Sequence, residues 1–431
     1  MRRILFIWLI FSCSSLLAQP YMPTENRELP RGEVMPYASA ADAAAGVENH
    51  RFGATITEWS TVGTTFAADF TAPFAWTNRQ VLVRIASASA EYALYINGRR
   101  VAFNADANTS ADFNITKQVK EGRNRIEIRL AEEPTTAPLE GWKEGPQTPQ
   151  LGRVQVLSSP TMGVRDVLTK CWRGKEEQLT NVEVAVVMKS YALNPRSARL
   201  YYELLNPQGE QVAQGHGDLT LRMRGEDTIR FLAEVPDTLL WSRTKPQWYT
   251  LRLRTMREGR VMEHHALPLG LRSVEVQEGK LVVNGQIETL QMAGIAPSAS
   301  LEEVEVLRKT GANTLYLLPG ADAERLYRMC DTLGMYVVAQ TPIDTHHSGS
   351  SRLKGGTVSN DPAWKAAFIE RAEHAYHTAK RHPSVIAFSL AHNSANGICL
   401  YESYLHMKQQ ADTRPMIYRD AEGEWNSDVL K

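Results

Sequence analysis

The sequence has few cysteines, no apolar run long enough to cross a membrane, and no excess of charge of either sign. Its 431 residues include four cysteines, and only Cys171, Cys330 and Cys399 lie beyond residue 18. Three widely spaced cysteines make neither a disulfide framework nor a metal-ligand cluster. A membrane-spanning helix needs about 20 apolar residues, which no segment provides. With 48 basic and 48 acidic residues, the chain offers nothing that would attract nucleic acid or an anionic membrane.

The N-terminus has the pattern of an export signal. Arg2 and Arg3 precede the apolar run Ile4–Phe11, and the small residues of Cys13–Ala18 follow. This order predicts a cleaved signal peptide at residues 1–18, rather than a buried strand or a lipoprotein acylated at Cys13. We therefore expect a periplasmic or cell-surface protein of a Gram-negative-type bacterium. Cleavage would leave 413 residues, enough for about three domains, with 46 basic and 48 acidic residues and a net charge of −2.

Two consecutive stretches, about 50–158 and 160–275, have the pattern of β-sheet domains. In the first, Asn97-Gly98 between two apolar runs indicates a hairpin, because a type I′ turn needs positive φ at both central residues. In the second, Val182–Met188 and Ala198–Leu205 are strand-like. Several strands at this spacing over about a hundred residues predict a sandwich of immunoglobulin type.

From about residue 285, short apolar runs alternate with helices. Ser300–Glu303 has the form of a capping box that begins a helix, and Asp361-Pro362 begins another. This alternation predicts parallel β/α units. The five expected strands are Leu290–Ile295, Asn313–Leu318, Met335–Ala339, Val385–Leu390 and Met416–Tyr418. A closed (β/α)8 barrel has eight strands in typically about 250 residues, and about 145 are present here, so we predict a partial barrel.

Short motifs occur in a fixed order along these three regions. Leu94–Val101 has a strand–Asn-Gly–strand form, Gly163–Val167 begins the second region, Leu281–Gly285 precedes the third, and His382–Leu390 contains its fourth strand. Together they resemble glycoside hydrolase family 2, the β-galactosidase and β-glucuronidase group, over nearly the whole chain after residue 18.

The resemblance implies a multidomain β plus α/β fold. Its parts would be a signal peptide at 1–18, a galactose-binding-like jelly-roll β-sandwich at 19–158, an immunoglobulin-like β-sandwich at 159–275, and a partial (β/α)8 TIM barrel of about five β/α units at 276–431.

The resemblance also implies that catalytic groups have been lost. Retaining glycoside hydrolysis uses two carboxyl groups about 5 Å apart, one as acid and one as nucleophile. In the family, the acid is the Glu of an Asn-Glu pair after the fourth strand, where this chain has His392-Asn393. A carboxamide cannot release a proton near neutral pH, so Asn393 cannot act as the general acid. The family's nucleophile lies on a seventh strand, which would follow Lys431. We therefore predict no catalytic residues.

Asp344 and His346 are the strongest candidates for a metal site. Asp344-Thr345-His346 resembles the Glu-x-His that helps to bind magnesium in some β-galactosidases, where the acid/base Glu, here Asn393, is a third ligand. A carboxamide binds a hard cation less well than a carboxylate does. Asp344, His346 and His392, with His347 alongside, would suit zinc better. We expect no cofactor and a solvated polar loop here, with a magnesium or zinc site as the alternative.

Trp142 is the aromatic residue best placed to bind a sugar. It lies in a loop-like segment after the strands of the first domain, and an exposed indole there could stack on a sugar ring. Packing is the alternative, because aromatic side chains dominate core burial. His374 and His377 fall on a long amphipathic helix, where we expect surface or capping roles.

Two kinds of function are compatible with these residues. We predict a non-catalytic envelope protein that binds a glycan or another envelope protein, and that forms oligomers through an open sheet edge after Met416–Tyr418. The alternative is an enzyme, either a divergent glycoside hydrolase or a metal-dependent hydrolase that uses Asp344, His346 and His392.

Overall fold

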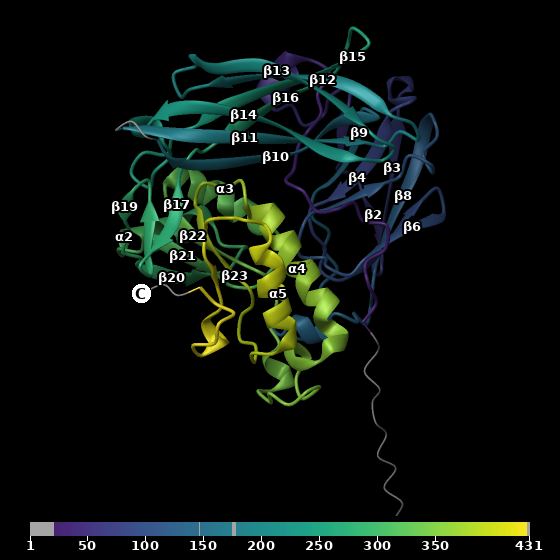
Figure 1. The fold of residues 1–431 in the computed structure, drawn as a ribbon. Helices are drawn as coiled ribbons and strands as arrows, with labels where there is room; N and C mark the ends of the chain where they lie inside the picture. The colour runs from purple at the N-terminus through teal and green to yellow at the C-terminus, as the bar shows by residue number, and fades with distance from the viewer. Residues whose placement is uncertain (1–20, 146, 175–177, 429–431) are drawn as a thin grey trace, which may run out of the picture.

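The structure, a computed structural model, describes residues 21–145, 147–174 and 178–428. The signal peptide predicted at residues 1–18 lies outside the described residues. In Figure 1, the sandwich nearer the N-terminus, called the first sandwich below, stands at the right. The second sandwich lies across the top of the molecule, and a parallel sheet with its helices fills the space below.

The first sandwich consists of two antiparallel sheets. One has the order β2-β3-β8-β5-β6, with bounds Ser60–Val62, Thr65–Ala72, Gly122–Leu130, Tyr92–Ile96 and Arg99–Asn104. The other has the order β1-β9-β4-β7, with bounds Gly53–Ile56, Val154–Ser159, Gln80–Ile85 and Ala111–Asn114. The hairpin predicted at Asn97-Gly98 joins β5 to β6, with φ of 51° and 77° at these two residues.

The second sandwich also has two antiparallel sheets. They are β10-β11-β14, with bounds Met162–Arg173, Leu179–Ser190 and Glu226–Pro236, and β13-β12-β15-β16, with bounds Gln211–Leu221, Arg196–Leu205, Tyr249–Arg257 and Arg260–Leu269. The strands predicted at 182–188 and 198–205 fall within β11 and β12. Tyr202 and Phe231 stack between the sheets with ring centroids 3.7 Å apart. A short helix, α1 (Ala40–Ala45), packs on β16.

The third region contains the five parallel strands that the sequence predicted. Their order is β20-β21-β22-β23-β24, with bounds Met292–Ile295, Thr314–Leu317, Tyr336–Gln340, Val385–Ser389 and Met416–Ile417. A small antiparallel sheet precedes them, formed by β17, β18 and β19 at Val274–Gln277, Lys280–Val283 and Gln286–Ile287.

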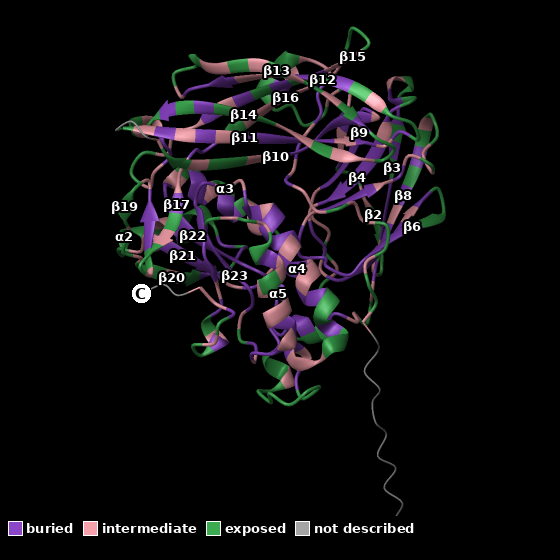
Figure 2. Ribbon diagram, in the orientation of Figure 1, coloured by how far each residue is buried: buried purple, intermediate pink, exposed green. Residues whose placement is uncertain are grey.

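Four helices cover the outer side of this parallel sheet. They are α2, α3, α4 and α5, at Leu301–Lys309, Ala323–Leu333, Lys365–Ala379 and Ile398–Lys408. Ser300 and Glu303 form the predicted capping box of α2. Asp361 caps a single 3-10 turn that begins at Pro362 and leads into α4. Leu315, Val337 and Phe368 belong to the buried layer between sheet and helices, which is purple in Figure 2.

The edge of the sheet at β24 is occupied by a later part of the same chain. The amide of Met416 donates to Asp428 Oδ2 (2.8 Å), and the carbonyl of Met416 accepts from the amide of Asp428 (2.8 Å). The amide of Tyr418 donates to Ser427 Oγ (2.9 Å). These contacts satisfy the outward-facing backbone groups of the strand. The edge that the sequence analysis expected to be open after Met416–Tyr418 is therefore covered, because Ser427 and Asp428 fold back onto it.

An N-terminal arm, residues 21–37, joins the three regions. Its contacts with the barrel, the first sandwich and the second sandwich include Tyr21 with Glu370 (2.8 Å), Glu25 with Phe103 (2.8 Å), and Glu28 with Lys189 (2.7 Å). Figure 1 shows this purple segment running up between the first sandwich and the helices of the barrel. The relative placement of the three domains therefore depends on the N-terminal arm, which lies outside their sheets.

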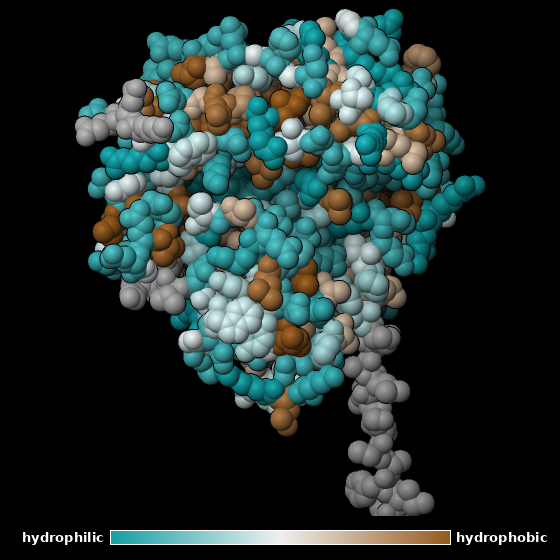
Figure 3. Space-filling view, viewed as in Figure 1, coloured by the Kyte–Doolittle hydropathy of each residue, from teal (hydrophilic) through white to brown (hydrophobic). Residues whose placement is uncertain are grey.

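The visible surface in Figure 3 is mostly hydrophilic, and its apolar patches gather mainly along the second sandwich. Leu232 on β14 is one exposed apolar residue of that sandwich. Among the residues that the structure describes, none of the helices is both long and apolar enough to cross a membrane.

Candidate functional site

The candidate site lies at the carboxyl ends of the parallel strands, where the loops after the strands of a β/α barrel gather. The loop of the first sandwich around Glu140 reaches this rim and pairs with the loop after β22 at Asp344, which in turn pairs with His392 after β23. The amide of Asp344 donates to the carbonyl of Leu139 (2.8 Å), and the amide of Gly141 donates to the carbonyl of Asp344 (2.9 Å). The first domain therefore forms part of the rim.

Asn393 is exposed at this rim, in the position that the sequence analysis identified with the family's acid. Its φ of 42° lies in the left-handed region, which asparagine tolerates better than most residues. Ser394 holds the turn, because its hydroxyl donates to the carbonyl of His392 (2.9 Å). Asn393 thus presents a carboxamide to solvent at the rim, a group that cannot release a proton near neutral pH.

The side chains around His392 are mainly hydroxyl groups and aromatic rings. The ring centroids of His392 and Tyr316 are 6.4 Å apart, and the Tyr316 and Ser389 hydroxyls are 3.0 Å apart. The guanidinium carbon of Arg419 lies 5.2 Å from the centre of the Tyr316 ring. Burial raises the pKa of Tyr316, so its hydroxyl stays protonated near neutral pH. This group can bind hydroxyl-bearing molecules, and the Asp420 carboxylate lies beside it, where its Oδ2 accepts from the amide of Ser394 (3.3 Å).

Sequence reasoning missed Ser389 and Arg419 as members of this group. The available signal was their position, since Ser389 ends β23 and Arg419 closely follows β24.

Asp344 and His346 do lie together, as the metal hypothesis requires, but they bind each other. Asp344 Oδ1 is 2.7 Å from His346 Nδ1 and accepts from the backbone amide of His346 (3.1 Å). The carboxylate is buried beneath Gly141, where an added Cβ would lie 3.0 Å from Asp344 Oδ1. Within the described ranges, no group of three or more His, Cys, Asp or Glu side chains is arranged to hold a metal ion. Asp344, His346 and His392 therefore do not form a ligand set in this geometry.

The loop that carries Trp142 lies against the barrel rim. Gly141 packs against His346, and His347 Nε2 is 3.2 Å from the carbonyl oxygen of Gly141. The Trp142 side chain is half-buried, with the Lys143 amine 5.8 Å from its ring centre. The indole is therefore less exposed than the sequence predicted, in a loop whose Gly141 docks on the barrel rim.

Glu140, next to this loop, is a buried carboxylate that the sequence analysis did not identify. It accepts from Arg371 Nη2 (2.6 Å), Lys143 Nζ (2.6 Å) and Asn108 Nδ2 (2.7 Å). Burial alone would raise the pKa of Glu140, but Lys143 and Arg371 outweigh it and hold the pKa below its usual range. Glu140 is therefore ionised near neutral pH and unsuited to act as a general acid.

His374 and His377, expected at the surface, are buried between α4 and the rest of the molecule. His374 Nδ1 lies 2.9 Å from Asp106 Oδ2 and 2.7 Å from Arg27 Nη1. His377 Nδ1 lies 2.9 Å from Lys380 Nζ. The expectation was wrong because the side of α4 that carries these residues packs on the first sandwich and the N-terminal arm.

Two β-sandwiches followed by a parallel β/α sheet, with a loop of the first sandwich at the carboxyl ends of the strands, define a multidomain architecture of glycoside hydrolases. Sequence models of one family match successive parts of the chain. They are the glycosyl hydrolases family 2 sugar binding domain at 54–137, the glycosyl hydrolases family 2 model at 172–272, and the family 2 TIM barrel domain at 289–430. The chain belongs to glycosyl hydrolase family 2.

Curated relatives include β-galactosidases. The chain is 21% identical over 379 residues to the enzyme of Priestia megaterium, covering 84% of this chain and 37% of the relative. It is 26% identical over 376 residues to that of Aeromonas hydrophila, covering 82% and 35%. The chain thus spans little more than a third of the length of these relatives. Among solved structures, a Bacteroides uniformis β-glucuronidase matches with a TM-score of 0.66 and 16% identity, over 82% of this chain and 46% of that one.

Proposed function

We propose that this protein is a non-catalytic, β-galactosidase-like member of its family that binds a glycan or another envelope protein. The observation that carries the proposal is the exposed carboxamide of Asn393 at the position of the acid. The nearby buried carboxylates support it, since Asp344 is bonded to His346 and Glu140 to Arg371 and Lys143. Lys143 and Arg371 hold the pKa of Glu140 below its usual range, which makes it a poor proton donor.

Hydrolysis assays test this proposal directly. Purified protein should not turn over nitrophenyl β-galactoside, β-glucuronide or β-mannoside, because loss of a general acid costs about 10²–10⁴-fold in rate. Asn393→Glu alone is not expected to restore hydrolysis, since a retaining mechanism needs a second carboxyl group about 5 Å away. Activity that copurifies with the protein and disappears in Asn393→Ala or His392→Ala would contradict the proposal.

Binding through the rim is the positive part of the proposal. The Trp142 indole offers an apolar face for a sugar ring, while Tyr316, Ser389 and His392 offer hydrogen-bonding groups. Trp142→Ala should weaken binding on a glycan array without lowering the melting temperature. Trp425→Ala is the control, because Trp425 is more exposed and packs on Tyr401 instead. If the parent protein binds no glycan, protein binding remains the proposed role.

Export and association complete the proposal. The signal peptide pattern at residues 1–18 favours a periplasmic or cell-surface location, which fractionation of the host cell would test. For oligomers, the edge at β20, where Met292 is exposed, supports association better than β24 does, because Ser427 and Asp428 cover the latter. Light scattering after size-exclusion chromatography would show a single monomer mass at all concentrations if this part is wrong.

A divergent glycoside hydrolase is the second candidate, favoured by the β-galactosidases among its relatives. Such an enzyme would have to use a proton donor other than Asn393. The two candidates differ in their response to substitution at the rim, since only the enzyme loses turnover in His392→Ala. A metal-dependent hydrolase using Asp344, His346 and His392 has less support, because Asp344 Oδ1 is bonded to His346.

A further inference from the structure

A cavity of about 610 Å³ lies where the N-terminal arm, both sandwiches and the barrel meet. This volume falls within the range of roughly 300–1,000 Å³ that is usual for small-molecule sites. The cavity is separate from the barrel rim, and its lining includes none of the rim residues Asp344, His392 and Asn393. What it binds therefore does not depend on whether the rim is catalytic.

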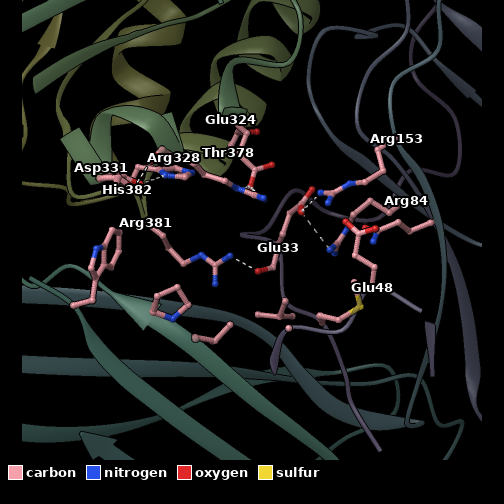
Figure 4. Close-up of a pocket in the computed structure, with 18 of the residues that line it drawn as sticks. Glu33, Glu48, Arg84, Arg153, Glu324, Arg328, Asp331, Thr378, Arg381 and His382 are labelled. Atoms are coloured by element: carbon pink, nitrogen blue, oxygen red, sulfur yellow. Dashed lines mark hydrogen bonds and ion pairs between the residues drawn. The ribbon is translucent and has the colours of Figure 1, made fainter. Parts of the chain in front are cut away.

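Four arginines from two domains line this cavity. Arg84 and Arg153 come from the first sandwich, Arg328 comes from α3 and Arg381 follows α4. In Figure 4, Glu33 of the arm lies between Arg381 on one side and Arg84 and Arg153 on the other. The lining thus brings together positive groups that are far apart in the sequence.

The carboxylates that line the cavity, apart from the exposed Glu48, already have partners. Asp331 Oδ2 is 2.6 Å from His382 Nδ1, and Asp331 Oδ1 accepts from the amide of Ser384 (3.0 Å). Glu324 is bonded to Arg328, one helical turn away. Glu33 Oε1 accepts from the Ser110 hydroxyl (2.7 Å).

Glu33 Oε2 lies 3.6 Å from Arg84 and 3.7 Å from Arg153, which is beyond ordinary hydrogen-bond length. Arg84 has its own close partner in Asp112, with contacts of 2.7 and 3.0 Å. The carboxylates thus balance the arginines, and the net charge of the lining is near zero. Whether an anion binds here depends on which arginines have N–H donors that no other group uses.

Two of the arginines have donors to spare. Within the described part of the chain, Arg381 makes a side-chain hydrogen bond only to the backbone carbonyl of Glu33, and no carboxylate oxygen lies within 4.0 Å of it. The nearby carboxylate of Asp166 is taken by Lys380 and by the amide of Gly32. Arg153 makes no side-chain hydrogen bond to a described residue. A guanidinium has five N–H donors, so both groups can bind a carboxylate or phosphate.

An apolar wall stands beside these donors. Trp248, Leu267 and Pro268 of the second sandwich line the cavity, together with Met35 of the arm. A few placed polar groups and an apolar wall are the usual composition of a small-molecule site.

We propose that this interdomain cavity binds a small organic anion, whose carboxylate is held by Arg381 and Arg153 and whose carbon skeleton packs against the wall that includes Trp248. The ligand would touch the arm, both sandwiches and the barrel at once. Its binding would hold the three domains together and raise the melting temperature of the whole chain.

Calorimetric titration of the full chain at low salt tests the proposal, with D-galacturonate as the anionic probe and D-galactose as its neutral counterpart. Galacturonate should bind at least about tenfold more tightly, which corresponds to about 1.4 kcal/mol for a charge-assisted hydrogen bond. Its affinity should fall as salt is added, because the pairing is partly exposed. Equal binding of the two sugars, or no heat from either, would overturn the proposal.

Substitutions separate the cavity from other sites. Arg381→Gln and Arg153→Gln should each weaken galacturonate binding about tenfold or more. Arg153→Gln is the safer variant, because Arg153 makes no hydrogen bond that the fold would lose. Arg254→Gln is the matched control, since Arg254 is an exposed arginine on β15 that stacks on Tyr201 outside this cavity. Unchanged affinity in both cavity variants, or an equal loss in the control, would overturn the assignment.

Titration with inorganic phosphate distinguishes a site that binds any anion from one that also requires the apolar wall. If phosphate binds as tightly as galacturonate and Trp248→Ala has no effect, the apolar part of the proposal is wrong. If Trp248→Ala weakens galacturonate but not phosphate, that part is supported.

Discussion

The rim of the barrel and the junction between the barrel and the two sandwiches hold charge in different ways. At the junction, buried ionic groups meet across domains, as Lys380 does with Asp166 and as Arg371 does with Glu140, where the loop of the first sandwich reaches the rim. At the rim, Asn393 presents an exposed amide, and Asp344 is hydrogen-bonded to His346 of its own loop. Buried ion pairs are costly to form and more costly to break. The difference teaches that the contacts which position the rim are buried and paired across domains, whereas the rim itself presents an exposed amide.

Breaking a junction pair should have the largest effect. Arg371→Met leaves Glu140 buried without its arginine, and we expect the free energy of unfolding to fall by about 3–5 kcal/mol. Urea denaturation, followed by both fluorescence and circular dichroism, measures this loss. The double variant Arg371→Met/Glu140→Gln should recover part of it, because no unpaired charge is then buried.

An exposed ion pair provides the control for this loss. Arg199 and Asp218 lie 2.7 Å apart on the outer face of the second sandwich, and Arg199→Met should cost no more than about 1 kcal/mol. If Arg371→Met were no worse than Arg199→Met, the junction would not differ from the surface in the way described.

Acid should weaken the junction. Burial lowers the pKa of both His374 and His377, so below pH 6.5 the unfolded chain binds protons that the folded chain does not. The contribution of these histidines to the free energy of unfolding is then complete above about pH 6.5. It declines as the pH falls, by up to about 1.4 kcal/mol per pH unit for each histidine. Denaturation midpoints measured between pH 7 and pH 5 would show this slope.

Substitution identifies the histidines responsible. His377→Gln keeps an acceptor for Lys380 and should flatten the slope, whereas His216→Gln, on an exposed position of β13, should leave it unchanged. A slope that is the same in His377→Gln would assign the pH dependence to other groups.

The contrast between rim and junction also explains which features of the structure could be predicted from the sequence. The five parallel strands, the capping box at Ser300 and the turn at Asn97-Gly98 were predicted correctly, because each depends on residues close together in the chain. The rim could be located for the same reason, since loops after parallel strands gather at one end of the sheet.

The junction could not be predicted, because its partners are distant in sequence. Glu140 and Arg371 are 231 positions apart, and Arg27 and His374 are 347 apart. An amphipathic pattern shows that one face of α4 is buried, but not that a second face meets another domain. The docking of the Gly141 loop on the barrel could not be predicted for the same reason, since nothing local to the loop reveals it.

A substitution in the loop that carries Gly141 tests the comparison of rim and junction with a smaller expected loss of stability. A Cβ added to Gly141 would lie 2.8 Å from His346 Nδ1 and 3.0 Å from the carbonyl oxygen of Asp344. Gly141→Ala should therefore lower the free energy of unfolding by about 1–3 kcal/mol through overpacking. Faster proteolysis within the loop would show that it has left the rim. Gly294→Ala is the matched control, because nothing lies within 4 Å of a Cβ there.

The smallest effect is expected where the chain covers the edge of its own sheet at β24. Asp428 accepts from the amide of Met416 and from the Tyr404 hydroxyl (2.6 Å), and its own amide donates to the carbonyl of Met416. Asp428→Ala removes the side-chain acceptor and should cost about 1 kcal/mol, whereas Asp428→Asn keeps an acceptor oxygen and should cost less. The more informative measurement is association, because an uncovered strand edge pairs readily with another chain. Light scattering should show that Asp428→Ala associates more with rising concentration than Asp428→Asn does. If neither variant associates more than the parent protein, then the side chain of Asp428 is not what protects this edge, and the backbone contact between Asp428 and Met416 is sufficient by itself.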